Sequence, residues 1–434
     1  MTESRIRFRG IWTQRVEAEF CGGEVTSEGG SLLLREVDRR LGLMRGVAEG
    51  ISDKRTAGKV EHSPIAILRQ RVYGIALGYE DLNDHDTLRK DMAFQTSVNR
   101  RGDLASAATL CRFENRMDRA IAVAIHEVMV EQFLKSFKRA PKKLILDFDA
   151  TNDPVHGKQE GRFFHGYYNE YCFLPLYVFC GEQLLVSYLR PSNIDPARHA
   201  WAILSLLVRA IRERFPDTQI VLRADSGFCR WRMLRWCERK NVYYCVGIAR
   251  NCRLQAKARQ TMKAAAAQFK KTKVKQRLFS DVQYAAETWD KARRVIIRAE
   301  HSEMGENPRF VVTNLAGDAQ ALYDKLYCAR GEMENRIKEQ QMGLFADRTS
   351  CHKWWANQFR LLLSSLAYIL IEGIRRLALK GTELARAQVW TIRLKLLRIG
   401  AVVTRNTRRI RFMLSSSYPF QDLFTIAAKR LAVT

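Results

Sequence analysis

The stretch that decides the fold is Leu144-Ile145-Leu146-Asp147-Phe148-Asp149, a short apolar run interrupted by two aspartates. Branched and aromatic residues in a run of this length predict a buried β-strand. Side chains alternate between the two faces of a strand, so Asp147 and Asp149 share one face. The turn-forming residues 150–154 follow directly. They place Asp149 at the carboxyl end of the strand and Asp147 deeper within it.

The residues downstream of this strand alternate between strand and helix patterns. Tyr171–Phe179 and Leu184–Leu189 predict a hairpin, closed by residues 180–183. Apolar spacing then predicts, in order, a helix over 201–215, a strand over 220–222, a helix over 233–240 and a strand over 243–248. This order predicts a mixed α/β sheet.

The flanking regions have a different composition. Residues 1–139 show helical spacing over Ser31–Leu41, Pro64–Leu77 and Ser106–Phe137, which predicts a mostly helical N-terminal domain that binds DNA, or a helical bundle that only supports the next domain. The helical pattern returns at Ala319 and carries Glu334, and a long helix is predicted over Trp354–Leu377. We therefore assign 140–250 and 315–378 to one catalytic core.

Two stretches are strongly basic. Residues 251–280 carry nine Lys and Arg and no acid, and three strand-like pieces follow near 282–288, 293–299 and 309–314. We interpret 251–314 as a basic, β-rich insertion whose like charges require a polyanion, although a charge run can also be an ordinary solvated face. The candidate DNA-binding lysines there are Lys270, Lys271, Lys273 and Lys275. The second basic stretch, 379–434, contains a possible hairpin around Asn406.

The overall charge favours a nucleic-acid partner. Seventy-three Lys and Arg against 46 Asp and Glu give a net charge of +27 in 434 residues, a field that attracts phosphate backbones. No apolar run reaches the roughly 18–20 residues that cross a bilayer, and the first residues lack the pattern of a signal peptide. The ten cysteines contain no C-x-x-C pair, which argues against a zinc ribbon. We expect a cytoplasmic protein without a membrane partner.

Three acids predict a metal site. Asp225 follows the strand over 220–222, so it joins Asp149 at the strand ends where α/β sheets place their ligands, and Glu334 approaches from a helix. Magnesium and manganese prefer such oxygen ligands. Two such ions can activate a nucleophile and neutralise a leaving oxygen in phosphoryl transfer. We favour Asp149 over Asp147 as the first ligand.

The helix around Glu334 carries further polar residues on one face. Helical spacing aligns Tyr327, Arg330, Glu334, Lys338 and Gln341. Glu334 and Lys338 could form a plain surface ion pair. A solvated stripe, however, has no need of a tyrosine and an arginine beside the carboxylate. Arg330 and Lys338 suit the phosphates that flank a scissile bond.

These motifs together resemble a known family. Asp149 to Gly157, Gly161 to Tyr168, Arg190-Pro191-Ser192-Asn193, Arg223 to Phe228 and Tyr327 to Lys338, in this order, resemble the DDE transposases of bacterial insertion sequences, specifically the thirteen-eighty family. The resemblance implies a ribonuclease-H-like core with a β-rich insertion before the glutamate. It also implies Mg2+-dependent hydrolysis and strand transfer at the terminal inverted repeats of a DNA element, and pairing of those ends by a dimer. The triad then maps to Asp149, Asp225 and Glu334.

The chain departs from the wider pattern at one place. A lysine is expected fourteen residues after the tyrosine, where this chain has Gln341; Lys338 is the substitute one turn earlier. Trp289 lies where related transposases hold a flipped base, but an edge-strand core residue is the simpler interpretation. His156 and His165 are interpreted as turn-ordering residues and not as ligands. A ribonuclease-H-like nuclease without strand transfer and a transposase-derived DNA-binding regulator are the alternative functions.

Overall fold

The computed structural model describes residues 5–53 and 55–432. These residues form two compact groups, one up to Phe113 together with Leu370 onward, and one over Glu114–Ile369. The second group holds Asp149, Asp225 and Glu334. The domain limits predicted from the sequence remain a prediction.

The second group is built on a large mixed sheet. Its nine strands follow the order β12-β13-β15-β11-β10-β4-β8-β9, with β14 paired to β13. The centre is parallel, because β10 pairs with β4 and with β11 in the parallel sense, and all the other pairs are antiparallel. The strands are β4 (Lys143–Ala150), β8 (Leu176–Cys180), β9 (Gln183–Tyr188), β10 (Gln219–Ala224), β11 (Tyr243–Ile248), β12 (Gln276–Tyr284), β13 (Arg293–Ser302), β14 (Gly305–Glu306) and β15 (Arg309–Thr313).

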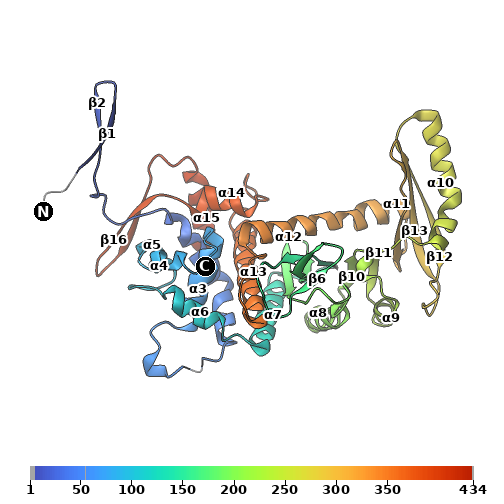
Figure 1. The fold of residues 1–434 in the computed structure, drawn as a ribbon, viewed down its shortest axis with the longest axis horizontal. Helices are drawn as coiled ribbons and strands as arrows, with labels where there is room; N and C mark the ends of the chain where they lie inside the picture. The colour runs from blue at the N-terminus through green and yellow to red at the C-terminus, as the bar shows by residue number, and fades with distance from the viewer. Residues whose placement is uncertain (1–4, 54, 433–434) are drawn as a thin grey trace. The chain divides into compact units, whose positions relative to one another are not determined.

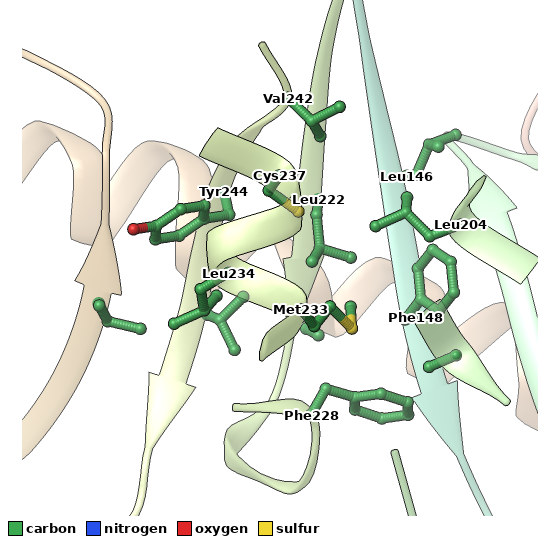
Figure 2. Close-up of a cluster of buried hydrophobic side chains, with 14 of the residues drawn as sticks. Leu146, Phe148, Leu204, Leu222, Phe228, Met233, Leu234, Cys237, Val242 and Tyr244 are labelled. Carbon is green, nitrogen blue, oxygen red and sulfur yellow. The ribbon is translucent and has the colours of Figure 1, made fainter. Parts of the chain in front are cut away.

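Helices cover one face of this sheet with a continuous apolar core. They are α7 (Arg119–Lys135), α8 (Ala200–Arg214), α9 (Trp231–Arg239) and α10 (Cys252–Thr272). Figure 1 shows α8 and α9 below the labelled strands β10 and β11. Figure 2 shows Met233, Leu234 and Cys237 of α9 packed toward Leu222 and Tyr244. Leu144, Leu146 and Phe148 of β4 belong to this core, so the alternation of the strand turns Asp147 and Asp149 to the opposite face.

The opposite face carries the helical segment with Glu334. It consists of α11 (Ala319–Ala321), the π-helical η4 (Leu322–Tyr327), the 3-10 turn η5 (Cys328–Arg330), α12 (Gly331–Leu344) and α13 (Trp354–Leu377). Phe179 lies opposite Asp147 in the β4–β8 ladder and packs edge-on against Tyr368 of α13, with ring centroids 5.7 Å apart. Because η4 and η5 are not α-helical, the continuous α-helix predicted from Ala319 is interrupted before α12.

The basic stretch over 251–280 differs from the prediction. Most of it forms α10, a 21-residue helix whose first turn is capped by Asn251, which accepts from the Leu254 amide at 2.9 Å. The β-strands that follow, β12, β13 and β15, extend the main sheet and do not form a sheet of their own. The segment is thus a helix backed by edge strands, as Figure 1 shows for α10, β12 and β13.

Other predicted elements are confirmed with adjustments. The helix predicted over 106–137 is two helices, α6 (Ala107–Glu114) and α7, because Asp118 starts α7 by accepting from the Ile121 amide. The strand predicted over 171–179 is also divided, into β7 (Glu170–Phe173) and β8; Pro175, between them, has no N–H to donate. β7 pairs with β5 (Asp153–Pro154) and β6 (Phe163–His165) in a small separate sheet.

The first group is mainly helical with two small sheets. Its helices are η1 (Gly29–Ser31), α1 (Leu32–Leu41), α2 (Leu43–Glu49), η2 (Ala57–Lys59), α3 (Pro64–Leu77), α4 (Asp84–Leu88), α5 (Met92–Ser97), α6, α14 (Val389–Ile392), η6 (Arg393–Leu397) and α15 (Gln421–Ala432). β1 (Ile6–Ile11) pairs with β2 (Gln14–Ala18), and the predicted C-terminal hairpin, β16 (Ala401–Arg405) with β17 (Ile410–Leu414), is confirmed and adds β3 (Val25–Thr26). No helix among the described residues is long and apolar enough to span a membrane.

Candidate functional site

Two aspartates meet at the carboxyl ends of the central parallel strands. The β4–β10 ladder runs to the pair Phe148 and Ala224, so Asp149 and Asp225 are the next residues on two adjacent strands. Asp225 lies just beyond β10, where its carboxylate accepts from the Gly227 amide at 2.9 Å and starts the short turn η3 (Ser226–Phe228). The structure thus places both acids at the carboxyl ends of adjacent strands, as the sequence predicts.

Asp147 has a different partner. It lies opposite Arg223 in the ladder and receives a two-pronged contact, with Nη2 of Arg223 donating to Oδ2 at 2.7 Å and Nε donating to Oδ1. The remaining guanidinium nitrogen, Nη1, donates to the Leu326 carbonyl at 2.6 Å, which ties η4 to the sheet. The side chains are only 2% and 8% exposed. Asp147 is therefore engaged in a buried ion pair, and Asp149 is the aspartate of this strand that faces the other acids.

Arg330 connects Asp149 to the helix. Its Nη1 donates to Asp149 Oδ2 at 3.0 Å, and its Nη2 donates to Glu334 Oε1. One guanidinium thus touches acids 185 positions apart in the chain. Asp149 is 14% exposed and Glu334 is 53% exposed, so the cluster opens to solvent on the helix side. Glu334 is paired with Arg330, and not with Lys338 as the surface-pair alternative required.

Asp225 and Glu334 both act on the carboxyl group of Asp149. The pKa of Asp149 is raised to about 6, chiefly by burial; Arg330 and the Ala150 amide oppose the rise, and Asp225 and Glu334 contribute to it. Burial also raises the pKa of Tyr327 to about 12, with Asp225 again contributing. A carboxylate with a raised pKa beside two others marks a place where a cation is favoured.

Tyr327 is held against the aspartate turn by a glycine. A β-carbon on Gly247 of β11 would lie 2.5 Å from the Tyr327 hydroxyl and 2.9 Å from the Ser226 amide nitrogen. Only glycine therefore allows η4 to approach β11 and the residue after Asp225 so closely. The Tyr327 ring also contacts Tyr323, with centroids 5.4 Å apart.

The donor set fits a hard divalent cation in its chemistry. Asp149, Asp225 and Glu334 offer only carboxylate oxygens, which Mg2+ and Mn2+ prefer. Within residues 5–53 and 55–432, however, no three His, Cys, Asp or Glu side chains are close enough to share one metal ion. Arg330 already occupies the position between two of these acids. Shared binding of a metal therefore requires the guanidinium to release at least one carboxylate.

Lys338 and Gln341, on the helix of Glu334, have different surroundings. Lys338 is exposed on α12 and has no ion pair in the described structure, so its charge is free for a ligand. Gln341, which stands in the expected lysine position, donates to the Asn152 carbonyl at 3.1 Å and holds the loop after β4. The departure from the family pattern thus has a structural role on the acid-bearing loop.

The insertion lysines lie far from the acids. Lys270, Lys271, Lys273 and Lys275 are exposed at the end of α10 and just before β12. β12 is an edge strand, five positions from β4 in the sheet, or roughly 24 Å at 4.8 Å per strand. Lys275 is paired with Glu300 at 3.0 Å. The structure does not bring these lysines to the triad, and any common ligand must span that distance.

Trp289, His165 and His156 were considered from the sequence but not assigned to the site. Trp289 packs edge-on against Tyr284, with centroids 5.6 Å apart, and Arg293 lies over its ring, which agrees with the core interpretation. His165 accepts from the Tyr167 amide at 3.3 Å, a turn-ordering contact. His156 is exposed.

Arg223, Gly247 and Tyr168 were missed from the sequence as members of this site. Burial raises the pKa of Tyr168, and the charges of Asp149 and Asp225 contribute to the rise. A signal existed for Arg223, since it and Asp147 are opposite charges among the apolar residues in the middle of two strands. No local pattern identifies Gly247 or Tyr168.

Comparisons with known proteins identify a matching family. The model of the family described as "Transposase DDE domain group 1" matches residues 8–434. No curated protein matches the chain. Among solved structures, the chain is similar to one described as a piggyBac transposase synaptic complex with hairpin DNA, at 10% sequence identity and a TM-score of 0.41, with 93% of this chain and 82% of that chain covered.

Proposed function

The chain belongs to the family of transposase DDE domains, group 1, and on that premise we propose that it is the transposase of an insertion sequence of the thirteen-eighty family. In this proposal it binds the terminal inverted repeats of its element as double-stranded DNA and pairs them as a homodimer. It then cuts the DNA and joins the freed 3′ ends to target DNA. The family implies a phosphoryl-transfer enzyme, and the order of cutting and joining is the finer part of the proposal.

The observation that carries the proposal is the contact of Arg330 with both Asp149 and Glu334. It unites the end of a central strand with a helix that follows the insertion, while Asp225 stands on the adjacent strand. We interpret the sheet as a ribonuclease-H-like core. In support, antiparallel β9, β8 and β4 continue into parallel β10 and β11, and both aspartates lie at carboxyl ends.

The triad residues would hold two Mg2+ or Mn2+ ions, which supply an activated nucleophile and neutralise the leaving oxygen. Arg330 is already poised at the same place, and a DNA phosphate can replace one of its carboxylate partners, because a guanidinium binds phosphate in the same forked geometry. Tyr327 keeps η4 against the Asp225 turn, and exposed Lys338 supplies a point charge to the phosphate backbone. Lys270, Lys271, Lys273 and Lys275 bind DNA farther along the duplex.

The test compares cleavage and binding in single variants. Asp149→Asn, Asp225→Asn and Glu334→Gln should each abolish cutting at the repeat boundary while the affinity for the DNA end stays within a few fold. Asp217→Asn, an exposed carboxylate in the same group of residues, is the matched control and should cut normally. An Asp149→Asn protein that cuts normally would move the first ligand to Asp147. Cutting without joining would indicate a nuclease, and a triple variant that still performs the protein's biological role would indicate a regulator.

A further inference from the structure

Asp153 is a buried carboxylate that no described residue neutralises. It begins β5, just beyond the turn after Asp149, and is 0% exposed. Neither of its carboxylate oxygens has a hydrogen-bond partner among the described residues. Thr349 lies close enough to oppose the rise in the pKa of Asp153, but their contact lacks the geometry of a hydrogen bond. The charged groups that act on it are Asp347 and Glu170, both acids.

The contrast with the neighbouring acids is informative. Asp147 is neutralised by Arg223 and Asp149 by Arg330. The chain carries 73 Lys and Arg, yet none of them forms an ion pair with Asp153 in the part of the chain that the structure describes. A buried charge without a partner is strongly unfavourable, so the position requires either a proton or a cation from outside the chain.

Two hydroxyl groups point to a cation. Tyr177 is fully buried, and its hydroxyl has no hydrogen-bond partner among the described residues. It lies opposite Asp149 in the β4–β8 ladder, so it faces the same side of the sheet, and both Asp153 and Asp347 act on its phenol. The Thr349 hydroxyl is likewise buried and without a partner. Three separate elements thus carry buried oxygens that lack a hydrogen-bond partner among the described residues, and Thr349 and Tyr177 each interact with Asp153.

We propose that Asp153, Tyr177, Thr349 and Asp347 bind a hard divalent cation of the calcium type, at a site distinct from the Asp149–Asp225–Glu334 triad. All four side chains present oxygen, the ligand that Ca2+ selects, and its flexible coordination accepts a mixture of carboxylates and neutral oxygens. Asp347 is exposed and gives the cation a path from solvent. The two carboxylates, Asp153 and Asp347, match the charge of a divalent ion.

The site lies where two catalytic segments are already joined. Gln159 Nε2 donates to the Thr349 carbonyl at 3.3 Å, and the Glu160 amide donates to the His352 carbonyl at 2.9 Å. The first segment continues the strand of Asp149, and the second continues the helix of Glu334. A bound cation would therefore fix the position of Asp149 relative to Glu334. This consequence rests on the proposed function, whereas the binding of the cation does not.

The experiment uses the full chain with the triad disabled as Asp149→Asn, Asp225→Asn and Glu334→Gln, so that catalytic metal binding cannot contribute. The melting temperature is measured after EDTA treatment and during titration with CaCl2, MgCl2 or KCl. We expect a rise of roughly 5–10 °C when Ca2+ reaches about 100 times its dissociation constant. Adding Asp153→Asn to this background should remove the rise, while adding Asp217→Asn should leave it unchanged. In EDTA, the Asp153→Asn protein should melt at the same temperature or higher, because an uncompensated charge is gone.

Several outcomes would overturn the proposal. They are a melting temperature that does not change with Ca2+, a melting temperature that rises with K+ alone, and a rise with Ca2+ that persists in Asp153→Asn. The first outcome would indicate that Asp153 is protonated and binds no cation. If Asp153→Asn fails to fold, Tyr177→Phe and Thr349→Val replace it, and each should raise the midpoint Ca2+ concentration by about tenfold. An unchanged midpoint in both would contradict the site. Because no step depends on DNA cleavage, failure of the proposed function and failure of this site are distinguishable.

Discussion

Replacing Arg223 by methionine should destabilise the catalytic sheet more than any surface substitution. The side chain makes a two-pronged contact with Asp147, with exposed fractions of only 8% and 2% for the pair. Removing one partner of a buried ion pair costs about 3–5 kcal/mol. Loss of the bond from Nη1 to the Leu326 carbonyl adds about 1 kcal/mol. We therefore expect a loss of about 4–6 kcal/mol in the free energy of unfolding.

Urea unfolding at neutral pH, followed by tryptophan fluorescence, measures this loss. Arg209→Met is the matched control, because the Arg209–Glu213 pair is 71% exposed on both sides and 3.9 Å apart; its cost should be about 0.5 kcal/mol or less. The double variant Asp147→Leu/Arg223→Met should recover at least half of the loss, since apolar residues replace a buried pair at little cost. A cost below about 1 kcal/mol for Arg223→Met would refute the account of Asp147 as a paired residue and reopen it as a metal ligand.

Three further predictions concern the site and the DNA. Burial raises the pKa of Asp149 to about 6, so the metal-free folded protein binds this proton more tightly than the unfolded chain does. Urea unfolding in EDTA should therefore show the free energy of unfolding falling by about 1.4 kcal/mol from pH ~5 to pH ~8. The Asp149→Asn protein should lack this fall. Gly247→Ala should slow cleavage and destabilise by about 1–3 kcal/mol, because the new methyl group meets a tyrosine hydroxyl and backbone; unchanged rate and stability in the cleavage and urea assays would contradict the close approach. Binding isotherms should give a steep, linear plot of log K against log salt, and replacing Lys270, Lys271 and Lys273 by glutamine should lower its slope by up to about 2.7; an unchanged slope would exclude these lysines from the DNA contact.

Local patterns in the sequence predict much of the sheet and both strand-end aspartates. The alternation in Leu144–Asp149 predicts the shared face of Asp147 and Asp149, and the observed packing of Leu144, Leu146 and Phe148 on the other face is its direct consequence. The helix over Pro64–Leu77 is confirmed to the residue. These features depend on neighbours in the chain, which a pattern can detect.

Helix α10 was missed although a signal was present. The nine Lys and Arg over 251–280 were interpreted as like charges that repel one another, but four consecutive alanines, Ala264–Ala267, strongly favour a helix. Asn251 also provides the N-cap. Propensity and capping therefore outweighed the charge pattern in this segment.

Contacts between distant parts of the chain could not be predicted. Spacing places Arg330 one turn before Glu334, but its bond to Asp149 depends on how the helical segment crosses the sheet. Asp153 had the pattern of an ordinary turn residue, and only the packed structure shows it fully buried. Such positions are determined by tertiary packing, which leaves no periodic trace in the sequence.

The most direct test of the central claim is a strand-transfer assay. Purified protein is incubated with a labelled duplex that ends in the element's own inverted repeat, together with a target plasmid, in Mg2+ or in EDTA. The account predicts cutting at the repeat boundary and a joined product in Mg2+ alone, and loss of both in Asp149→Asn. Binding of the duplex without any metal-dependent cutting would contradict it.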